Sequence, residues 1–389
     1  MFRLTSAFLL LPFFLAAQDS SAVKKKMKDY VQAGGYLKDL QVVSFFPGDS
    51  IQTYNYIHNR LNFHFSPAKH LTAAVEVRNR IYYGQQVYDT PGYGKLVSQD
   101  NGYFNLSALV VNGRSFVATT MIDRGWIDWS EKKWEVRFGR QRINWGKTLV
   151  WNPNDLFNAF NFTDFDYEEQ PGSDALRADY YPNGMSAVEM AVRPGRKKNE
   201  AVAAGLWRFN KRGYDIQLLG GLYKTDIAFG TGWAGNIGNA GFKGEATWFQ
   251  PKDKFTDTSG VLSATMTADY SFSNTLYLEA AVLFNNHPVK NAFLFIPGQA
   301  AGTAISAKNL MPSEWSFFAQ ASGSPTPLIT LSFASMYGAD PGFVFIMPSC
   351  SYSISDNWDI MLLGQSVFFS SGKKIRSFSN AFLRLKWSF

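Results

Sequence analysis

Residues 138–158 of this chain, FGRQRINWGKTLVWNPNDLFN, concentrate cations, tryptophans and asparagine-rich turns in a short stretch. Such a stretch could serve catalysis, bind a nucleic acid, or belong to a protein built for a solvent other than water. A second stretch, DFDYEE at 164–169, carries enough carboxylates that it could bind a calcium ion. Which chemistry applies depends on the elements that position these two stretches.

The sequence gives little support to catalysis or to a bound ion. No serine stands in a motif such as G-x-S-x-G, and the four histidines (His58, His64, His70 and His287) are better suited to lining a pore or an interface. The fragments GTGWAG and GNIGNAG lack the lysine and helix of a phosphate loop, and DFDYEE lacks EF-hand spacing. We predict no catalytic residue, no metal site and no cofactor.

Composition indicates strands that alternate apolar and polar residues. Aromatic residues make up 16% of the 389 and charged residues only 18%, yet the mean hydropathy is −0.16. A helical membrane protein would be far more hydrophobic overall. Many aromatics with little net hydrophobicity suit a chain in which every second residue faces an apolar phase.

The first residues predict export. Arg3 precedes an apolar run from Ala7 to Ala17, which is typical of a signal peptide and too short to span a bilayer as a helix. We expect cleavage after Ala17, with Ala22 as the alternative, and a periplasmic leader over 18–30. The net charge of +7 could suggest nucleic acid, but export argues against that partner. The lone Cys350 excludes a disulfide within the chain.

Period-two segments such as 54–65, 70–84 and 260–272 dominate the rest of the chain. They run to about 10–14 residues, longer than the ~5–6 of soluble strands and enough to cross a bilayer when tilted. Short turns alternate with long loops at 84–113, 144–183 and 287–312. These features predict an all-β, antiparallel, up-and-down transmembrane barrel over 31–389, with about 16 strands (14–18).

The final segment, NAFLRLKWSF, places Trp387, Leu385 and Leu383 on the face of the terminal Phe389. This pattern resembles the assembly signal of Gram-negative outer-membrane barrels. It implies contact with the barrel-assembly machinery and with outer-membrane lipid.

The quoted stretch then begins as a membrane strand. Trp134, Val136 and Phe138 would face lipid, and Glu135 and Arg137 the lumen. Strict alternation would turn the next two arginines (Arg140 and Arg142) toward lipid, where charge is costly unless it lies at the interface. We favour a bulge at Gly139 that shifts the register and turns both arginines inward.

The run GRQRINWG, followed by WNPNDLFN and YEEQPGSDALR over 139–177, resembles a large group of Gram-negative outer-membrane porin-like β-barrels. That group is of mostly undefined function and distantly similar to alginate-export channels. The resemblance implies a barrel in which the GRQ strand leads into a long loop folded over or into the pore. The resemblance does not indicate which solute such a pore would transport.

Charge suggests how such a loop would act. We expect a basic lumen wall and an acidic, aromatic loop that narrows the pore, an arrangement that can set ion selectivity; the alternative is that the charges only dock a plug. The predicted pore-lining residues are Arg60, Glu76, Arg78, Arg80, Arg137, Arg140, Arg142, Lys147, Arg384 and Lys386. The predicted constriction residues are Asp155, Asp164, Asp166, Glu168, Glu169, Asp174 and Arg177.

Three functions remain open from the sequence. The chain could be a porin that passes small anionic solutes, an export channel for polysaccharide or lipid, or a plugged barrel that displays the loops 84–113 and 287–312. An enzyme is not expected. The chain could also form homo-oligomers, and the sequence does not determine its oligomeric state.

Overall fold

The computed structural model describes residues 30–46, 51–159, 169–253, 255–290, 305–371 and 374–389. The strands of these residues are β1 (Val31–Phe45), β2 (Gln52–Ala68), β3 (Leu71–Gly84), β4 (Ser107–Asn112), β5 (Phe116–Glu131), β6 (Trp134–Gln141), β7 (Ser173–Asn183), β8 (Ser186–Arg193), β9 (Val202–Lys211), β10 (Tyr214–Tyr223), β11 (Asp226–Ile237), β12 (Ala240–Pro251), β13 (Val261–Ser271), β14 (Tyr277–Asn285), β15 (Trp315–Thr326), β16 (Ile329–Gly338), β17 (Phe343–Ser355), β18 (Trp358–Ser371) and β19 (Lys374–Ser388). Two short helices, α1 (Gln85–Asp89) and α2 (Tyr93–Val97), follow β3. Neither helix in the described part of the chain is long and apolar enough to span a membrane.

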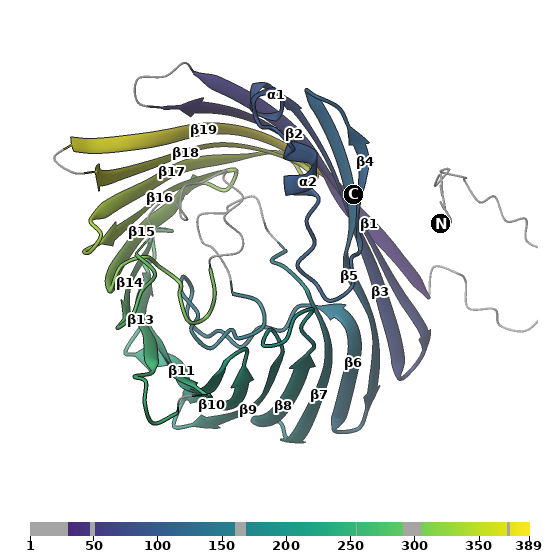
Figure 1. Ribbon diagram of the computed structural model, residues 1–389, viewed down its shortest axis with the longest axis vertical. Helices are drawn as coiled ribbons and strands as arrows, with labels where there is room; N and C mark the ends of the chain where they lie inside the picture. The colour runs from purple at the N-terminus through teal and green to yellow at the C-terminus, as the bar shows by residue number, and fades with distance from the viewer. Residues whose placement is uncertain (1–29, 47–50, 160–168, 254, 291–304, 372–373) are drawn as a thin grey trace, which may run out of the picture.

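Eighteen of these strands form a closed antiparallel ring (Figure 1). Strand β1 pairs with β2 on one edge and with β19 on the other, where Tyr36 lies opposite Ser388 and Phe45 opposite Ser379. The remaining strand, β4, pairs with β5 alone. Because β3 occupies one edge of β5, the other edge is shared between β6 at residues 125–131 and β4 at 117–121. The expected up-and-down barrel is confirmed.

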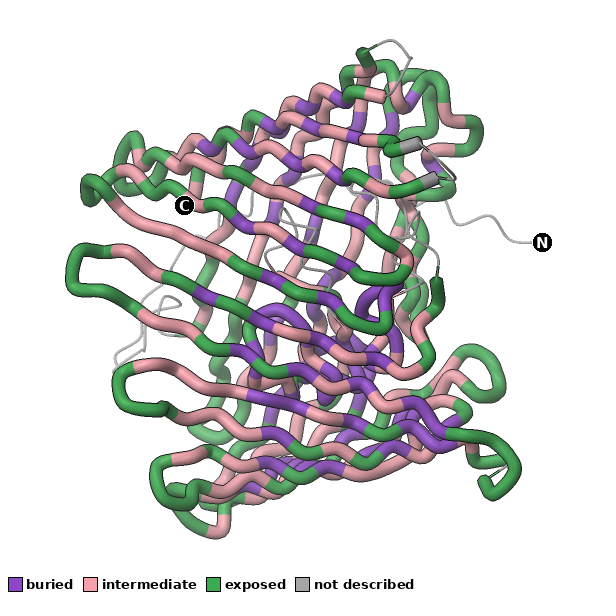
Figure 2. Tube along the Cα trace, turned by 90° about the vertical axis from the view of Figure 1, so that its left-hand side faces the viewer, coloured by how far each residue is buried: buried purple, intermediate pink, exposed green. Residues whose placement is uncertain are grey.

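Alternation along each strand explains why the ring forms (Figure 2). On β13, Ser263, Thr265 and Thr267 are buried on the inner face, whereas Met266 on the outer face is 45% exposed. An outer face of apolar residues and an inner face of polar ones is the pattern of a barrel that stands in lipid.

The number of strands differs from the expected value of about 16, because 18 strands close the ring. Over 200–249, where the glycine-rich sequence does not mark clear strand boundaries, the chain forms four strands, β9–β12. Its glycine-rich run, GTGWAGNIGNAGF, offers several candidate turn positions. Only the backbone shows which one is used: Gly238, with φ of 61°, turns the chain between β11 and β12.

Connections at one rim are short, and several at the other rim are long. The short rim holds, among others, the turns at 69–70, 132–133, 184–185, 212–213 and 238–239. The opposite rim holds 85–106, 142–172 and 286–314. The loop after β6 therefore spans 142–172 rather than the expected 144–183, because residues 173–183 belong to β7. Their charged alternation, SDALRADYYPN, looked like loop in the sequence but forms a wall strand.

We expect Gly139→Ala to destabilise the barrel. Gly139 has φ of 119°, and a Cβ there would overlap the carbonyl oxygen of Gly125 and lie 2.9 Å from the Cα of Trp126. A non-glycine residue in this conformation costs about 1–3 kcal/mol. Urea unfolding in detergent micelles should show a lower midpoint for this variant.

The matched control is Gly184→Ala. Gly184 lies in a short turn where an added Cβ would meet nothing within 4 Å. An unchanged midpoint for Gly139→Ala would refute the conformational requirement.

Candidate functional site in the barrel lumen

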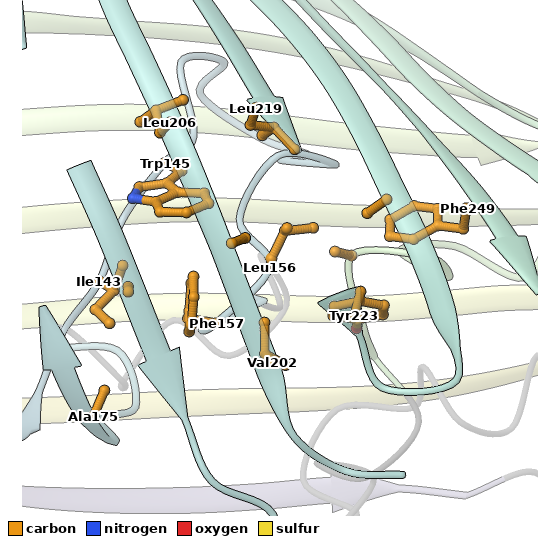
Figure 3. Packing of buried hydrophobic residues seen from close by; sticks show 14 of the residues in the cluster. Ile143, Trp145, Leu156, Phe157, Ala175, Val202, Leu206, Leu219, Tyr223 and Phe249 are labelled. Atoms are coloured by element: carbon orange, nitrogen blue, oxygen red, sulfur yellow. The ribbon is translucent and has the colours of Figure 1, made fainter. Parts of the chain in front are cut away.

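The segment that follows β6 enters the barrel and packs on its inner wall. Ile143, Trp145, Leu156 and Phe157 are at most 3% exposed. They share one hydrophobic cluster with these inward residues of β8–β12: Ala191, Val202, Ala204, Leu206, Leu219, Tyr223, Ala228 and Phe249. Figure 3 labels the four residues together with Val202, Leu206, Leu219, Tyr223 and Phe249 of this cluster. We call residues 143–158 the docked segment. Burial of this size in an apolar cluster holds the segment inside the lumen.

A single carboxylate of the wall fixes the middle of the docked segment. Glu245 of β12 is 1% exposed and accepts hydrogen bonds from the backbone N–H groups of Lys147, Thr148 (2.8 Å) and Asn154 (3.0 Å). The Thr148 hydroxyl adds a further bond at 3.2 Å. Hydrogen bonds to a carboxylate are among the stronger hydrogen bonds in proteins, and here one carboxylate accepts several of them.

Further wall side chains hold both ends of this region. The Trp145 indole donates to Glu189 of β8 at 2.7 Å, and Gln217 of β10 donates to the Trp145 carbonyl at 2.7 Å. Thr247 of β12 donates to the Asn154 side chain at 2.6 Å. These contacts use wall residues that strand alternation turns inward, so the docking depends on the barrel being formed.

Asp155, a predicted constriction residue, lies within this docked region. Its side chain is 2% exposed, and its Oδ1 has no hydrogen-bond partner. Burial raises the pKa of Asp155 well above its ordinary value, although the nearby Arg142 opposes this. The structure places Asp155 among packed residues rather than in open lumen.

Other long connections also pack inside. Trp151 of the docked segment joins Leu310 and Met311 in a cluster against inner residues of β14–β18. Val87 of α1 packs on Tyr82 and Val117 of β3 and β5. Residues of both connections, 84–113 and 287–312, therefore pack on the inner wall, whereas the scaffold hypothesis predicts that these loops are displayed outward.

The opposite side of the lumen is basic. Strand register aligns Lys386 of β19, Lys38 of β1, His58 of β2 and Arg80 of β3 in one row on the inner face. Arg60 and Arg78 are register partners one step away. We call the inner face of β19, β1, β2 and β3 the basic wall.

One end of the loop touches the basic wall. The Tyr36 hydroxyl donates to the Glu169 carboxylate at 3.0 Å, and Arg60 lies 3.7 Å from the same carboxylate. Arg124 of β5 donates to the backbone carbonyls of Glu169 and Gln170. The chain after β6 is thus docked on β8–β12 at its start and reaches the basic wall at its end.

Arg60 is the centre of the ion pairs on this wall. It contacts Glu76 and, at 2.8 Å, Asp123 of β5, which also lies 3.7 Å from Arg78 and 3.3 Å from Arg124. With Glu169, three carboxylates meet three guanidinium groups here, so the cluster itself is close to neutral and the net positive charge of the basic wall comes from its other cations.

No family model matches the sequence, and no curated protein matches it. Solved structures do share the fold: Acinetobacter baumannii OccAB4 is 10% identical with a TM-score of 0.59, covering 92% of this chain and 98% of that one. Pseudomonas aeruginosa OccK5 (OpdH) is 9% identical with a TM-score of 0.59, covering 93% and 98%, and the outer membrane protein opdK of Pseudomonas aeruginosa is 6% identical with a TM-score of 0.58, covering 92% and 99%. The chain has the fold of a Gram-negative outer-membrane porin.

The porin fold agrees with the resemblance seen in the sequence, and the link to alginate-export channels stays a prediction. Three predicted constriction residues, Asp164, Asp166 and Glu168, lie outside the described residues.

The expected register shift at Gly139 is wrong. Pairing runs unbroken through this residue on both edges of β6, with Trp126 on β5 and Ala175 on β7 as its partners. The positive φ of Gly139 occurs without an inserted residue. Strict alternation turns Arg140 away from the lumen, and the surrounding chain, rather than a bulge, shields its charge from lipid.

Arg140 is enclosed by protein. Its guanidinium pairs with Asp174 of β7 at 2.7 Å and with Asp100 at 2.8 Å, and it donates to the Phe104 carbonyl at 2.8 Å. Asp100 and Phe104 belong to the β3–β4 connection, which covers the end of β6. Arg140 and Asp174 were predicted to line and narrow the pore, and the structure places them together in this buried cluster.

Two other predicted arginines lie in the wall of β6 and β7. Arg137 pairs with Asp128 at 2.9 Å and with Glu135 at 3.3 Å. Arg177 pairs with Glu135 and, at 2.8 Å, with Asp179. Arg177 belongs to a strand and not to the loop. Carboxylates surround both arginines, so this part of the lumen is closer to neutral than the basic wall.

Lys147 lies at the short-turn rim. It lines a cavity of about 650 Å³ with Lys132, Lys133, Tyr181 and Arg208, among others. The docked segment therefore extends from the lumen interior toward this rim.

Sequence reasoning missed the residues that hold the docked segment, above all Glu245, Glu189 and Gln217. Alternation along β8, β10 and β12 could have turned them inward. No local signal could have shown that a segment about a hundred residues away in the chain supplies the donors for Glu245.

We expect Glu245→Leu to release the docked segment. Loss of a buried charged acceptor removes several bonds and leaves the N–H groups without a partner, at about 3 kcal/mol or more in total. Single-channel recordings should show larger and noisier conductance, and limited proteolysis should cut within 143–158. Glu245→Gln keeps one acceptor oxygen, so its conductance and its proteolysis should lie between those of the wild type and Glu245→Leu.

Glu279→Leu is the matched control. Glu279 is also on the inner face and 8% exposed, but its hydrogen-bond partner is Tyr277 of its own strand. Equal effects of Glu245→Leu and Glu279→Leu would show that the anchor has no special role.

Proposed function

We propose that the chain is an outer-membrane porin of a Gram-negative bacterium that passes small anionic solutes. The porin fold supports a channel, and it agrees with the expectation that the chain is not an enzyme. The outer face, apolar along most strands, fits a place in lipid.

The basic wall is the observation that carries the anion preference. Its inner face holds Lys38, Arg60, Arg78, Arg80, Arg384 and Lys386, whereas Glu76 is the only carboxylate on that face in the described parts of the four strands. A channel lined by one sign of charge raises the local concentration of ions of the opposite sign. Rows of arginine and lysine are the usual means of selecting anions in pores.

The docked segment forms the side of the pore that lies opposite the basic wall. Because it fills the lumen beside β8–β12 and Trp151 reaches the β14–β18 side, a solute would have to pass between these packed residues and the basic wall. This arrangement places a permeating anion close to the cations rather than at the centre of a wide pore.

The experiment is the reversal potential of the refolded protein in a planar bilayer under a potassium chloride gradient. We expect preference for chloride. Replacing Arg384 and Lys386 together with glutamine should shift the reversal potential toward zero, because it removes two positive charges from the basic wall.

Lys243→Gln is the control, since Lys243 lies on β12, away from the basic wall, and already pairs with Asp269 of β13 at 3.0 Å. A cation-selective wild type would contradict the anion preference. A wild type that conducts no current would contradict the channel itself and favour the plugged scaffold.

A further inference from the structure

The cavity at the short-turn rim brings together cations from three distant parts of the chain. We call this space of about 650 Å³ the rim cavity. Lys132 and Lys133 come from the β5–β6 turn, Lys147 from the docked segment and Arg208 from β9. Asp215 of β10 is the only carboxylate that the described residues contribute to its lining. Four cations against one carboxylate give the lining a net charge of +3.

The rim cavity lies on the inner side of the barrel. Alternation turns Arg208 to the same face as Leu206, and Asp215 to the same face as Gln217, and both Leu206 and Gln217 are buried on the inner face. Lys147 reaches the cavity from within the lumen. The strands β9 and β10 lie across the ring from β19, which belongs to the basic wall (Figure 1). The rim cavity is therefore a second, separate concentration of positive charge along the same pore.

Protein groups satisfy only some of these cations. Arg208 lies 3.6 Å from the Glu189 carboxylate, and Lys133 donates to a backbone carbonyl of β7 at 2.7 Å. The ammonium groups of Lys132 and Lys147 make no hydrogen bond or ion pair with any residue that the structure describes. A concave surface lined by one sign of charge concentrates ions of the opposite sign. The rim cavity thus favours an anion from solution.

Neutral groups beside the lysines suit the remainder of an organic anion. The side-chain oxygen of Asn183 accepts bonds from the Met185 N–H and the Ser186 hydroxyl, each at 2.9 Å. Its amide nitrogen donates to no described residue. Tyr181 adds a phenol to the lining, and Phe209 adds apolar surface. A ligand that carries hydroxyl groups as well as its charge fits this lining.

Charge and size together favour a phosphate ester. Lysine binds phosphate as a point charge, and arginine can bind it through two N–H groups. A phosphate monoester carries about two negative charges near neutral pH, whereas a carboxylate carries one, so the net charge of +3 suits the phosphate better. The volume lies within the range of roughly 300–1,000 Å³ that is usual for small-molecule sites. It leaves room for an organic part beside the phosphate.

We propose that the rim cavity binds a small hydroxylated phosphate ester, of the class of a sugar phosphate. Lys132 and Lys147 contact the phosphate, and Asn183 and Ser186 face the hydroxyl groups. Outer-membrane barrels have their short turns on the periplasmic side, so the site lies where a solute crosses between pore and periplasm. The inference rests on the proposed function for its place in transport, and it deepens that function by naming a class of solute.

The first test is isothermal titration calorimetry of the refolded protein in detergent, with glucose 6-phosphate as the probe. We expect this probe to bind and glucose, which lacks the phosphate, to give no signal. The double variant Lys132→Gln, Lys147→Gln should bind glucose 6-phosphate about tenfold more weakly, because it lacks two of the charges that meet the phosphate. Heat-modifiable migration in gels would verify that the variant barrel is folded.

The matched control is the double variant Lys197→Gln, Lys198→Gln, which removes two exposed lysines from the β8–β9 connection at the opposite rim. This variant should bind like the wild type. A wild type that does not bind glucose 6-phosphate, or an equal loss of affinity in the two double variants, would overturn the proposal. Gluconate, a carboxylate with a similar set of hydroxyl groups, separates the anion classes, and binding as tight as that of glucose 6-phosphate would overturn the assignment to phosphate.

The second test locates the ligand. With Cys350→Ala removing the native thiol, Ser186→Cys in the rim cavity and Thr256→Cys at the opposite rim are labelled separately with a maleimide. Saturating glucose 6-phosphate should slow the labelling of Ser186→Cys alone. An unchanged rate at Ser186→Cys would refute a ligand in the rim cavity.

Both tests measure binding without a current. A cation-selective or silent channel would contradict the proposed function, whereas calorimetry and labelling decide on the rim cavity by themselves. Failure of one is therefore distinguishable from failure of the other.

Discussion

Backbone hydrogen bonding in a medium without water is the constraint from which this structure follows. Every N–H and C=O group that faces hydrocarbon needs a partner in the protein, and a sheet meets that requirement only when its edges are joined. Here the joint is the pairing of β1 with β19, which brings the two ends of the described chain together. Closure fixes an inside and an outside, and alternation then distributes side chains between lipid and lumen.

The same rule explains why the interior is built from polar anchors. A segment inside the lumen has its own backbone groups to satisfy, and it has no strand neighbour to do so. Glu245 accepts hydrogen bonds from three backbone N–H groups of the docked segment, and the Gln217 amide donates to one of its carbonyls. The apolar cluster around Trp145 adds burial, and together these contacts turn an irregular segment into a fixed part of the channel.

The lumen thereby has two unlike sides. One is occupied by packed segments on β8–β12 and β14–β18, and the other is the basic wall of β19, β1, β2 and β3. Glu169 and its neighbour Gln170 connect the two, since they meet Tyr36, Arg60 and Arg124. The ion pairs at Arg60 can therefore hold the loop and shape the field of the pore at once, so docking and selectivity are compatible roles for the same charges.

The sequence by itself determined the class of fold, the inward position of Arg60, Arg78 and Arg80, and the outward face of the last strand, because strand alternation is a local property of period two. It predicted about 16 strands, with a range of 14–18, where 18 close the ring, and it assigned 173–183 to a loop because charged residues obscured their alternation. Only the tertiary structure decided that Asp155 is buried, that Arg140 lies in a cluster with Asp100 and Asp174, and that Glu245 anchors the docked segment. Those contacts join residues far apart in the chain, and closure of the ring is what brings them within bonding distance.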